Sequence, residues 1–423
     1  MGEDLHSERV AVLGAGISGL SSAVLLKEKG YDVCLLEASD RVGGLARSFD
    51  WHGFHCDIAP HRLFTRDKEA KERLLELVPM HRHQRRSRIF IAGRIVRDPV
   101  NPLELLLRLS PRISSRLVWG YLFKPKLPED SFENLALNKF GRGLYEFFFK
   151  PYTTKMFGVT PAEISVTWGR QKLRVSGLRD VIRRDTKIFF REFHYPKQGG
   201  YGAICHALAD RVADNTLLNS RVVGIEADEG RIRAVRYETN GEPRRYECDR
   251  LVSTLPATVL GRMLGHDFSL RFQSVVLVYL LVDKPQVMPY HWIYFGDSDV
   301  VINRMSEFKN FAHADTPENR TALVAEVTIP SDDPLDDVLS ALERYDLLRR
   351  HEVLDSMLLQ ERFAYPVYDR HYEKAMEESQ QVFGRFENLH LVGRNAEFRH
   401  IEVDEAFASA LAMVRGLTAK KTP

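Results

Sequence analysis

The sequence predicts an α/β protein that is built around a strand–helix–strand unit near its N-terminal end. Val10–Leu13 is an apolar run typical of a buried strand, Ser18–Lys29 has the apolar spacing of a helix, and Asp32–Leu36 is a second apolar run. From residue 269 to residue 365 the pattern changes to long alternating segments, which predict an antiparallel sheet with one buried and one wet face. The chain of 423 residues is long enough for more than one domain.

Three glycines at the turn from the first strand into the helix predict a bound dinucleotide. Gly14, Gly16 and Gly19 have the G-x-G-x-x-G spacing, which permits a tight turn, close approach of backbone to a pyrophosphate and close helix–strand packing. Ser18 opens the helix, whose free N–H groups and positive dipole end favour phosphate. Glu37, at the end of the second strand, would accept hydrogen bonds from ribose hydroxyls and disfavours NADP. The unit is Rossmann-like; a glycine-rich turn without a ligand is the alternative.

The segment after this unit indicates which dinucleotide is expected to bind. It reads E-x-x-x-R-x-G-G-x-x-R, with Arg41, Gly43, Gly44 and Arg47 after the acid. This pattern resembles the extended fingerprint of the FAD-binding family that includes amine oxidases, protoporphyrinogen oxidase, phytoene desaturase and UDP-galactopyranose mutase. The resemblance implies FAD as the cofactor, with the Gly43-Gly44 backbone against it and both arginines bonding its diphosphate. Taken without the resemblance, the residues also fit a turn with a surface arginine pair.

Two later segments resemble further FAD-binding motifs of the same family. Gly393-Arg394 ends an apolar strand near the C-terminus, and the resemblance places its backbone near the flavin ribityl chain and pyrophosphate. Asp404 is expected to cap a helix over Glu405–Gly416, whose N-terminus would point at the flavin ring. Val222 matches a strand whose backbone holds the adenine in relatives.

A loop and a helix resemble substrate-side segments of UDP-galactopyranose mutase and its oxidase relatives. Ala59–Thr65 (APHRLFT) implies that His61 lies beside the isoalloxazine, although a structural histidine is the alternative. Tyr152–Ile164 resembles a second mutase segment, after which an arginine binds the substrate diphosphate. Arg174 is the candidate here, but the R-x-P-V-R pattern of the mutase is absent.

These resemblances imply a flavoenzyme and leave three functions open. The first is an FAD-dependent oxidoreductase that transfers a hydride from a small-molecule C–H to flavin N5. The second is a redox-neutral enzyme like the mutase, in which reduced N5 attacks the anomeric carbon of a nucleotide sugar. Against it, the paired tyrosines of the mutase are replaced by Phe398 and His400. The third is a flavin-stabilised protein without catalysis.

The chain is expected to cross between the nucleotide domain and other regions more than once. Parts of the FAD-binding domain are expected at 1–60, 193–260 and 366–423. A helical insert and cap region is expected at 61–192, and a substrate-domain sheet at 261–365. Trp292, Tyr294, Arg304 and Phe308 could line this sheet toward the flavin, or could pack within it.

Composition limits the partners. The 60 basic and 58 acidic residues give a net charge of +2, so no global charge favours nucleic acid. Four scattered cysteines without ligand spacing predict a reducing compartment, which we take as the cytoplasm, and no metal site. A small-molecule substrate is expected, with a nucleotide sugar among the candidates, and the oligomeric state is left open. The polar start, MGEDLHSE, does not resemble a signal peptide, and no apolar stretch is long enough to span a bilayer.

Two basic segments have open interpretations. His81–Arg88 is either a solvated edge or an anion-binding rim. Pro102–Leu122 is Leu-rich, is interrupted by Pro111 and carries Arg108, Arg112 and Arg116. It fits a core helix or lid, and it also fits a helix that contacts a membrane surface.

Overall fold

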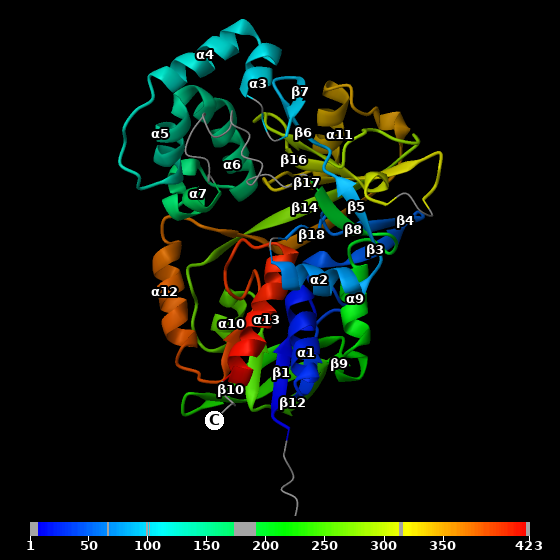
Figure 1. Ribbon diagram of the computed structural model, residues 1–423, viewed down its shortest axis with the longest axis vertical. Helices are drawn as coiled ribbons and strands as arrows, with labels where there is room; N and C mark the ends of the chain where they lie inside the picture. Colours follow the sequence, from blue (N-terminus) through cyan, green and yellow to red (C-terminus); the bar gives the residue numbers. More distant parts are fainter. Residues whose placement is uncertain are drawn as a thin grey trace, which may run out of the picture.

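The computed structural model describes residues 7–65, 67–98, 100, 102–172, 192–312 and 316–419 of the chain. The molecule is elongated, with an α/β region at one end, a large sheet in the middle and a group of helices at the other end (Figure 1). Arg174 lies outside the described residues.

A five-stranded parallel sheet forms the centre of the α/β region. Its spatial order is β19-β13-β1-β2-β9, formed by Leu389–Leu391, Arg250–Ser253, Arg9–Leu13, Asp32–Leu36 and Thr216–Leu217. The predicted N-terminal unit is confirmed, since β1 and β2 pair in parallel and flank helix α1 (Ile17–Glu28). Both faces of β1 are buried: Val10 and Val12 pack toward α1 and helix α13 (Val403–Ala419), and Ala11 and Leu13 pack on the opposite side. Burial of both faces is typical of a parallel sheet.

Smaller elements surround this sheet. Strands β10 (Ser220–Asp228), β11 (Arg231–Thr239) and β12 (Glu242–Glu247) form an antiparallel sheet that packs on its second face. The remaining elements of the α/β region are β3 (Ser48–Trp51), β4 (Phe54–Asp57), α2 (Lys68–Leu77), α9 (Ala203–Asp210), α10 (Ala257–Met263) and α12 (Tyr372–Phe383), with 3-10 turns at Gly44–Ala46 and Ala213–Asn215. Strands β3 and β4 pair as an antiparallel hairpin that turns at His52-Gly53.

A seven-stranded sheet lies in the middle of the molecule. Its order is β18-β14-β17-β16-β15-β6-β7, formed by Val353–Val367, Arg271–Val282, Thr321–Val327, Ile302–Glu307, Trp292–Phe295, Ser87–Ile91 and Arg94–Arg97. Helix α11 (Pro334–Arg344) packs into the same apolar cluster as several of these strands. The 3-10 turns Phe308–Asn310 and Arg350–Glu352 adjoin it. The sheet is antiparallel as expected except at one place, where β15 and β6 pair in parallel.

The basic segment His81–Arg88 contributes to two strands. Strand β5 (Met80–Gln84) pairs with β8 (Glu192–Pro196), and β6 begins at Ser87 within the large sheet. Arg85 forms an ion pair with Asp98 and lies over the ring of Trp292. Local sequence did not indicate this role because the pairing partners are far along the chain.

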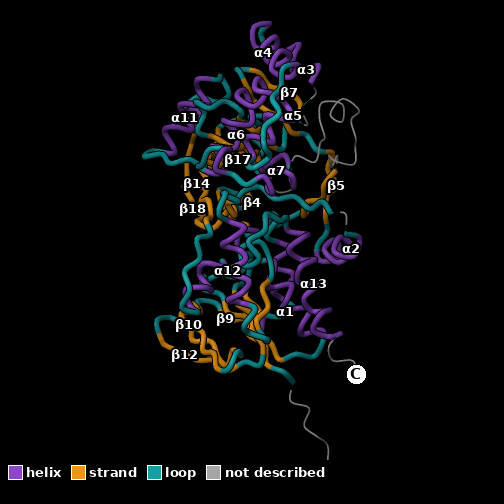
Figure 2. Tube along the Cα trace, turned by 90° about the vertical axis from the view of Figure 1, so that its left-hand side faces the viewer, coloured by secondary structure: helices purple, strands orange, loops and turns teal. Residues whose placement is uncertain are grey.

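The helical end is formed by residues 102–172 (Figure 2). Its elements are α3 (Pro102–Arg108), α4 (Pro111–Leu122), α5 (Phe132–Leu144), a π-helical turn (Tyr145–Phe149), α6 (Lys150–Phe157), a 3-10 turn (Pro161–Glu163) and α7 (Val166–Lys172). The break predicted at Pro111 is confirmed: Pro111 begins α4, and the Ser110 side chain accepts a hydrogen bond from the Ile113 amide. Helix α6 contacts β16, so it brings its side chains against the large sheet.

All four cysteines are buried and free. In the described part of the chain, no cluster of three or more His, Cys, Asp or Glu side chains is arranged to hold a metal ion. Likewise, none of the helices in that part has the length and apolar character needed to cross a membrane.

Candidate functional site

The larger of two adjoining cavities, about 530 Å³, lies where the glycine loop before α1 meets the C-terminal motif. Residues from five separate parts of the sequence line it. They include Gly14, Gly16, Ser18, Glu37, Gly43, Gly44, Arg47, His61, Thr254, Glu361, Arg394, Glu402 and Val403. Eight residues of the predicted cofactor set therefore surround one space: Gly14, Gly16, Ser18, Glu37, Gly43, Gly44, Arg47 and Arg394.

The glycines of this wall are required by close backbone contacts. Gly14 has a φ of +92°, in the region that favours glycine, and a Cβ there would lie 2.6 Å from Oγ1 of Thr254. A Cβ on Gly19 would lie 1.8 Å from the carbonyl oxygen of Gly14, so α1 can pack against the loop only with glycine at this position. The amide of Gly43 donates to the carbonyl of Ala15 (2.8 Å), which joins the second glycine pair to the first loop.

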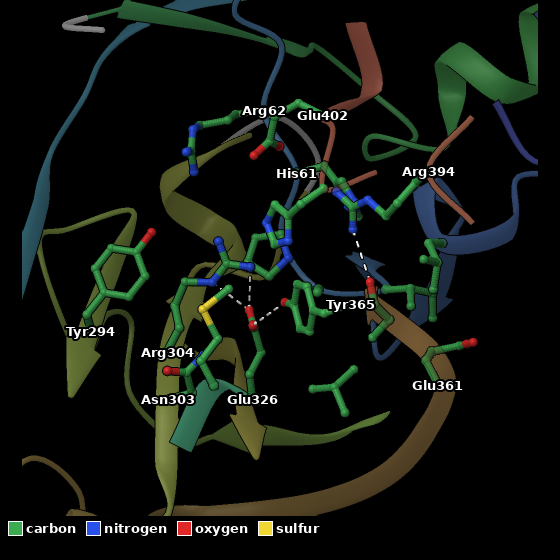
Figure 3. A pocket seen from close by; sticks show the side chains of 18 of the residues that line it. His61, Arg62, Tyr294, Asn303, Arg304, Glu326, Glu361, Tyr365, Arg394 and Glu402 are labelled. Atoms are coloured by element: carbon green, nitrogen blue, oxygen red, sulfur yellow. Dashed lines mark hydrogen bonds and ion pairs between the residues drawn. The ribbon is translucent and has the colours of Figure 1, made fainter. Parts of the chain in front are cut away.

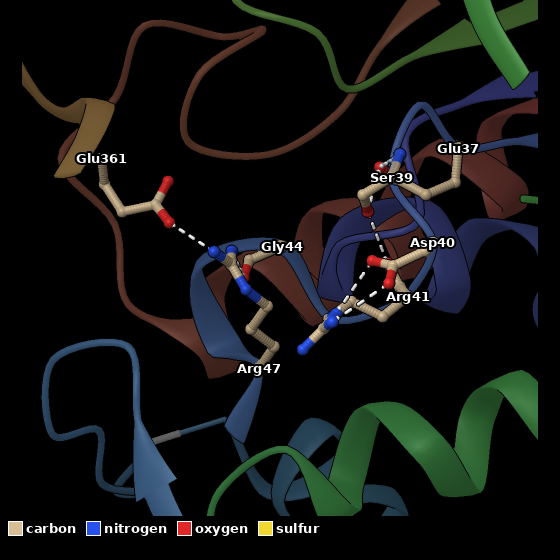
Figure 4. Close-up of polar contacts among 7 residues, drawn as sticks. All are labelled: Glu37, Ser39, Asp40, Arg41, Gly44, Arg47 and Glu361. Atoms are coloured by element: carbon tan, nitrogen blue, oxygen red, sulfur yellow. Dashed lines mark hydrogen bonds and ion pairs between the residues drawn. The ribbon is translucent and has the colours of Figure 1, made fainter. Parts of the chain in front are cut away.

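Glu37 fixes the loop that precedes α1. Its carboxylate accepts hydrogen bonds from the Ala15 amide (2.7 Å) and from the amide and hydroxyl of Ser39 (2.9 Å each). Arg41, further along the chain, forms an exposed ion pair with Asp40 and is not among the residues that line the cavity (Figure 4). Its predicted contact with the diphosphate stays a prediction.

Arg47 connects the glycine wall to the large sheet. Its guanidinium donates to the carbonyl of Gly44 (2.8 Å) and to the carboxylate of Glu361 on β18 (2.6 Å), as Figure 4 shows. Both side chains are only partly exposed and both line the larger cavity. Arg47 therefore supplies a positive charge there whose orientation is set by the sheet.

The C-terminal motif closes the opposite side. Gly393 has a φ of +93°, and a Cβ on it would lie 2.0 Å from Oγ of Ser18, so this glycine allows contact with α1. Arg394 donates through Nε and Nη2 to the carbonyl of Ile401 (2.9 and 2.6 Å) and through Nη1 to that of Ala364 (3.2 Å). These bonds hold the loop over residues 395–401 against the end of β18.

The start of the last helix differs from the prediction. Helix α13 begins at Val403, so Asp404 lies in its first turn and does not cap it. The amide of Glu402 instead donates to the carboxylate of Glu405 (2.9 Å). Asp404 is buried, and burial raises the pKa of its carboxyl to about 6. The packing of the apolar Ile401 and Val403 starts the helix two residues earlier than the sequence suggested.

The smaller cavity, about 140 Å³, opens beside the first and is lined by many polar and charged side chains (Figure 3). Leu45, His61, Glu361, Arg394 and Glu402 line both cavities. The other residues that line the smaller one include Arg62, Tyr152, Tyr294, Asn303, Arg304, Glu326, Tyr365 and His400.

His61 lies at the junction of the two cavities and stacks on Tyr201, with ring centroids 5.3 Å apart. Burial lowers the pKa of its imidazole to about 4, and Arg394 acts in the same direction, so the ring is neutral near pH 7. Its loop is held by Asp57, a fully buried carboxylate that accepts bonds from the His61 backbone and from the hydroxyls of Tyr195 (2.8 Å) and Ser48 (2.6 Å). His61 thus lines both cavities, and its predicted position beside the isoalloxazine stays a prediction.

A buried ion pair forms one wall of the smaller cavity. Nε of Arg304 on β16 lies 2.6 Å from the carboxylate of Glu326 on β17, and the Glu326 side chain is 1% exposed. The hydroxyl of Tyr365 donates to the same carboxylate (3.3 Å). Tyr152 and Tyr294 meet edge to face nearby, and burial raises the pKa of Tyr152 well above its ordinary value. The Tyr152 hydroxyl therefore stays protonated and can donate a hydrogen bond.

Arg62 is one of four charged residues of this cavity that the sequence did not single out, with Glu326, Glu361 and Glu402. Its guanidinium lies over the rings of Phe64 (5.0 Å) and Trp292 (4.7 Å). Within the described residues it forms no ion pair, unlike Arg304 and Arg47. The only local signal was its position next to His61, and the Trp292 face that holds it comes from another part of the chain.

Several other candidates lie away from the cavities. Val222 is buried in β10, and Phe308 packs in an apolar cluster with residues of β14 and β17. The ring of Trp292 contacts the guanidinium of Arg62. Tyr294 and Arg304 do line the smaller cavity, as the sequence suggested for residues of this sheet. Of the two residues that stand in place of the mutase tyrosines, Phe398 is buried and His400 lines the cavity, stacked on Tyr365.

The larger cavity fits a dinucleotide in its chemistry. Helix α1 has no side-chain cap at Gly16, so its first amides are available to a phosphate, and Arg47 lies in the same wall. Glu37 adds the acceptor that a ribose requires. The volume lies within the range of about 300–1,000 Å³ that is usual for small-molecule sites.

The comparison with known families agrees with this class of site. Residues 17–412 match the family described as flavin containing amine oxidoreductases, and the chain therefore belongs to that family. The family predicted from the fingerprint motifs is confirmed, and with it the flavin cofactor.

Individual relatives differ in what they do. The chain is 26% identical over 270 residues to an L-amino acid oxidase of Cerastes cerastes, an alignment that covers 57% of this chain and 49% of the relative. It is 26% identical over 216 residues to a probable UDP-galactopyranose mutase of Klebsiella pneumoniae, covering 49% and 54%. The chain thus spans about half the length of these curated relatives. A crystal structure of reduced UDP-galactopyranose mutase has the same fold, with a TM-score of 0.86 and 23% identity over 99% of this chain and 95% of the other.

Proposed function

We propose that the chain is an FAD-dependent oxidoreductase that removes a hydride from a C–H bond of a small substrate. The observation that carries the proposal is the junction of the two cavities at His61, Glu361, Arg394 and Glu402. One cavity has a glycine wall and an uncapped helix start, and the other is lined by tyrosines and charged pairs. A substrate in the smaller cavity would lie beside a ligand in the larger one.

The proposed cofactor contacts follow the two walls. Gly14, Gly16, Ser18, Glu37, Gly43, Gly44, Arg47 and Arg394 would touch FAD, while Gly19 and Gly393 allow the close packing of this wall. Arg41, Val222 and Asp404 are kept as weaker candidates. We propose the domain layout expected from the sequence, with FAD-binding parts at 1–60, 193–260 and 366–423. Strands β6 and β7 of the 61–192 insert also belong to the large sheet.

Bound flavin supplies hydride acceptance and, when reduced, can supply a nucleophilic nitrogen. The chain's own residues orient the substrate and exclude water. His61 is neutral because of its lowered pKa, so it can bond a substrate without adding positive charge. The hydroxyls of Tyr152 and Tyr294 can donate hydrogen bonds, and the Arg304–Glu326 pair fixes the cavity wall.

A second candidate is the redox-neutral conversion of a nucleotide sugar. Arg62 favours it, because a guanidinium that lines the cavity and has no acidic partner among the described residues suits an anionic substrate such as a diphosphate. Arg174 remains a further candidate for that contact.

Absorbance and activity measurements on the purified protein test both candidate functions. We expect flavin absorbance in the purified protein, and bleaching of the oxidised flavin when the correct amine, amino acid or related substrate is added without oxygen. Absence of flavin would contradict the whole proposal. If a nucleotide sugar is instead converted only by protein reduced with dithionite, with no net consumption of an electron acceptor, the oxidoreductase proposal is wrong and the second candidate holds.

Variants of two arginines test the substrate side. Arg62→Gln should raise KM for an anionic substrate about tenfold, since one charge-assisted contact is lost. Arg344→Gln is the matched control, because Arg344 also lies over an aromatic ring, that of Tyr345, but at an exposed site. Equal KM values in the two variants would exclude a role for Arg62 in binding.

A further inference from the structure

The helical end has an unusual concentration of exposed apolar side chains. Leu107, Trp119, Leu122 and Phe123 are 77%, 66%, 64% and 68% exposed. Among the described residues, six of the ten exposed large hydrophobic side chains lie between residues 107 and 127. Scattered exposed leucines need no explanation, but a cluster of this kind marks an interaction surface.

Most of this cluster lies on the face of helix α4 that points away from the core. Val118 and Trp119 lie about one turn before Leu122 and Phe123, so the four side chains share the outer face at the end of the helix. Leu117 on the inner face is buried, and α4 packs against α5 on that side. The rings of Trp119 and Phe123 contact each other edge to face, with centroids 4.6 Å apart, so they form one apolar ridge.

Basic residues precede and follow the ridge along the chain. Between residues 104 and 126, Glu104 is the sole acid against five basic residues. Glu104 is engaged by Arg97 and Arg108, and Arg116 pairs with Glu146. The remaining cations, which have no ion-pair partner within the described residues, are Arg112, Lys124 and Lys126. Trp119, Leu122 and Phe123 together with these three cations are called the α4 patch below.

The position of the α4 patch leaves it accessible. Figures 1 and 2 both place α3 and α4 at the extreme end of the long axis, opposite the α/β region. The helix protrudes from the molecule, so a flat surface can approach it without contact with the α/β region.

We propose that the α4 patch docks the protein on an anionic lipid surface. Trp119, Leu122 and Phe123 would enter the boundary between headgroups and acyl chains, and Arg112, Lys124 and Lys126 would lie among the lipid phosphates. A second copy of the chain fits less well, because self-association through this face would bring the same unpaired cations together. The proposal is independent of the proposed function, since none of these residues lines either cavity.

Co-sedimentation of the flavin-containing protein with lipid vesicles tests the proposal. We expect binding to vesicles of phosphatidylglycerol and phosphatidylcholine, weakening with added salt, and little binding to phosphatidylcholine alone. Arg112→Gln/Lys124→Gln/Lys126→Gln should lower the partition coefficient about a hundredfold. Trp119→Ala/Phe123→Ala should lower it by about tenfold or more, since two buried rings are lost.

The matched control is Leu354→Ala/Leu358→Ala, which removes two exposed leucines from β18, 51% and 44% exposed. It should bind vesicles like wild type, and all variants should keep flavin absorbance and thermal stability. Failure of wild type to bind anionic vesicles, or equal binding by wild type and both patch variants, would overturn the proposal. So would concentration-dependent dimerisation that Trp119→Ala/Phe123→Ala abolishes, because the occupant would then be a second copy.

Discussion

Single buried polar groups determine the shape of the site. Asp57 accepts hydrogen bonds from the backbone amide of Tyr201 (2.9 Å), from the Tyr195 and Ser48 hydroxyls and from the His61 backbone, so one carboxylate organises strands and loops from distant parts of the chain. Burial raises its pKa to about 6 despite these bonds. Such a group is costly unless it is satisfied, which makes its partners specific.

The first prediction concerns Gly19, whose replacement by alanine would place a Cβ 1.8 Å from the Gly14 carbonyl oxygen. Gly19→Ala should lower the free energy of unfolding by about 1–3 kcal/mol and reduce flavin content, because the loop and α1 must separate. Gly416→Ala is the control: no atom lies within 4 Å of the position that a Cβ would take on this helical glycine, and alanine there should stabilise α13 by up to about 1 kcal/mol. Absorbance spectra and thermal melts measure both, and wild-type flavin content in Gly19→Ala would contradict the account.

The second prediction concerns Asp404, whose carboxyl has a pKa raised from 3.8 to about 6 by burial. A raised pKa means that the folded state binds the proton more tightly, so this contribution to stability is complete below pH 3.8 and is lost as pH rises through 6. Asparagine does not ionise, so Asp404→Asn should remove this loss of folding stability at rising pH, which amounts to about 3 kcal/mol at most.

Denaturation at a series of pH values checks this. The stability difference between Asp404→Asn and wild type should grow from acidic to neutral pH and then level off. A difference that does not change with pH would show that Asp404 titrates normally.

At the scale of elements, the helical end is tied to the large sheet by a lysine. Lys155 on α6 is buried, and its ammonium, which has three N–H donors, lies within hydrogen-bond distance of four backbone carbonyls, among them those of Asp297 (2.9 Å), Ile302 (3.1 Å) and Val300 (3.2 Å). Burial lowers its pKa to about 8. The Tyr-Thr-x-Lys segment therefore contributes Tyr152 to the cavity and Lys155 to the support of that cavity.

Lys155→Met should destabilise the protein by about 3 kcal/mol, because the carbonyls lose a charged donor while the apolar stem is kept. Lys150→Met is the matched control on the same helix, since Lys150 is exposed. Urea unfolding would compare them, with a change of less than half a kcal/mol, about the usual surface effect, expected for the control. Equal stability of both variants would mean that these contacts contribute little.

Elements with a strong local pattern were predicted and others were not. The β1–α1–β2 unit, the β3–β4 hairpin and the α3–α4 break follow from apolar spacing, glycine and proline. The sequence does not predict β18 as one long strand. Most of its residues are half-buried or exposed, and its sequence lacks a clear alternation of apolar and polar residues. The basic segment His81–Arg88 is not predicted as strand because its pairing partners lie far along the chain: β5 pairs with β8, and β6 pairs with β15.

At the scale of the whole molecule, the larger cavity is assembled from segments that include residues 14–47, 254–256, 360–363 and 394–406. A ligand that fills it would bridge the α/β region and the large sheet. Because such a ligand binds only the folded chain, it must stabilise that chain.

Removal of the cofactor should therefore lower the Tm, and FAD added at about a hundred times its Kd should restore about 2.7 kcal/mol. NADP is the control ligand: Glu37 in this wall disfavours a 2′-phosphate, so NADP should leave the Tm unchanged. Thermal melts of flavin-depleted protein with each nucleotide measure the effect. Equal stabilisation by the two nucleotides would contradict the role given to Glu37.

The sequence by itself determined the glycine loop, the acid after β2, the fingerprint residues and the family, because these depend on local spacing and on chemistry that only a few residue types allow. The tertiary structure decided the smaller cavity and the exposed surface. It brought Arg304 against Glu326, placed Arg62 on the ring of Trp292 and exposed the α4 patch. These features arise from contacts between residues far apart in the chain, where burial and pairing energies depend on the packed fold.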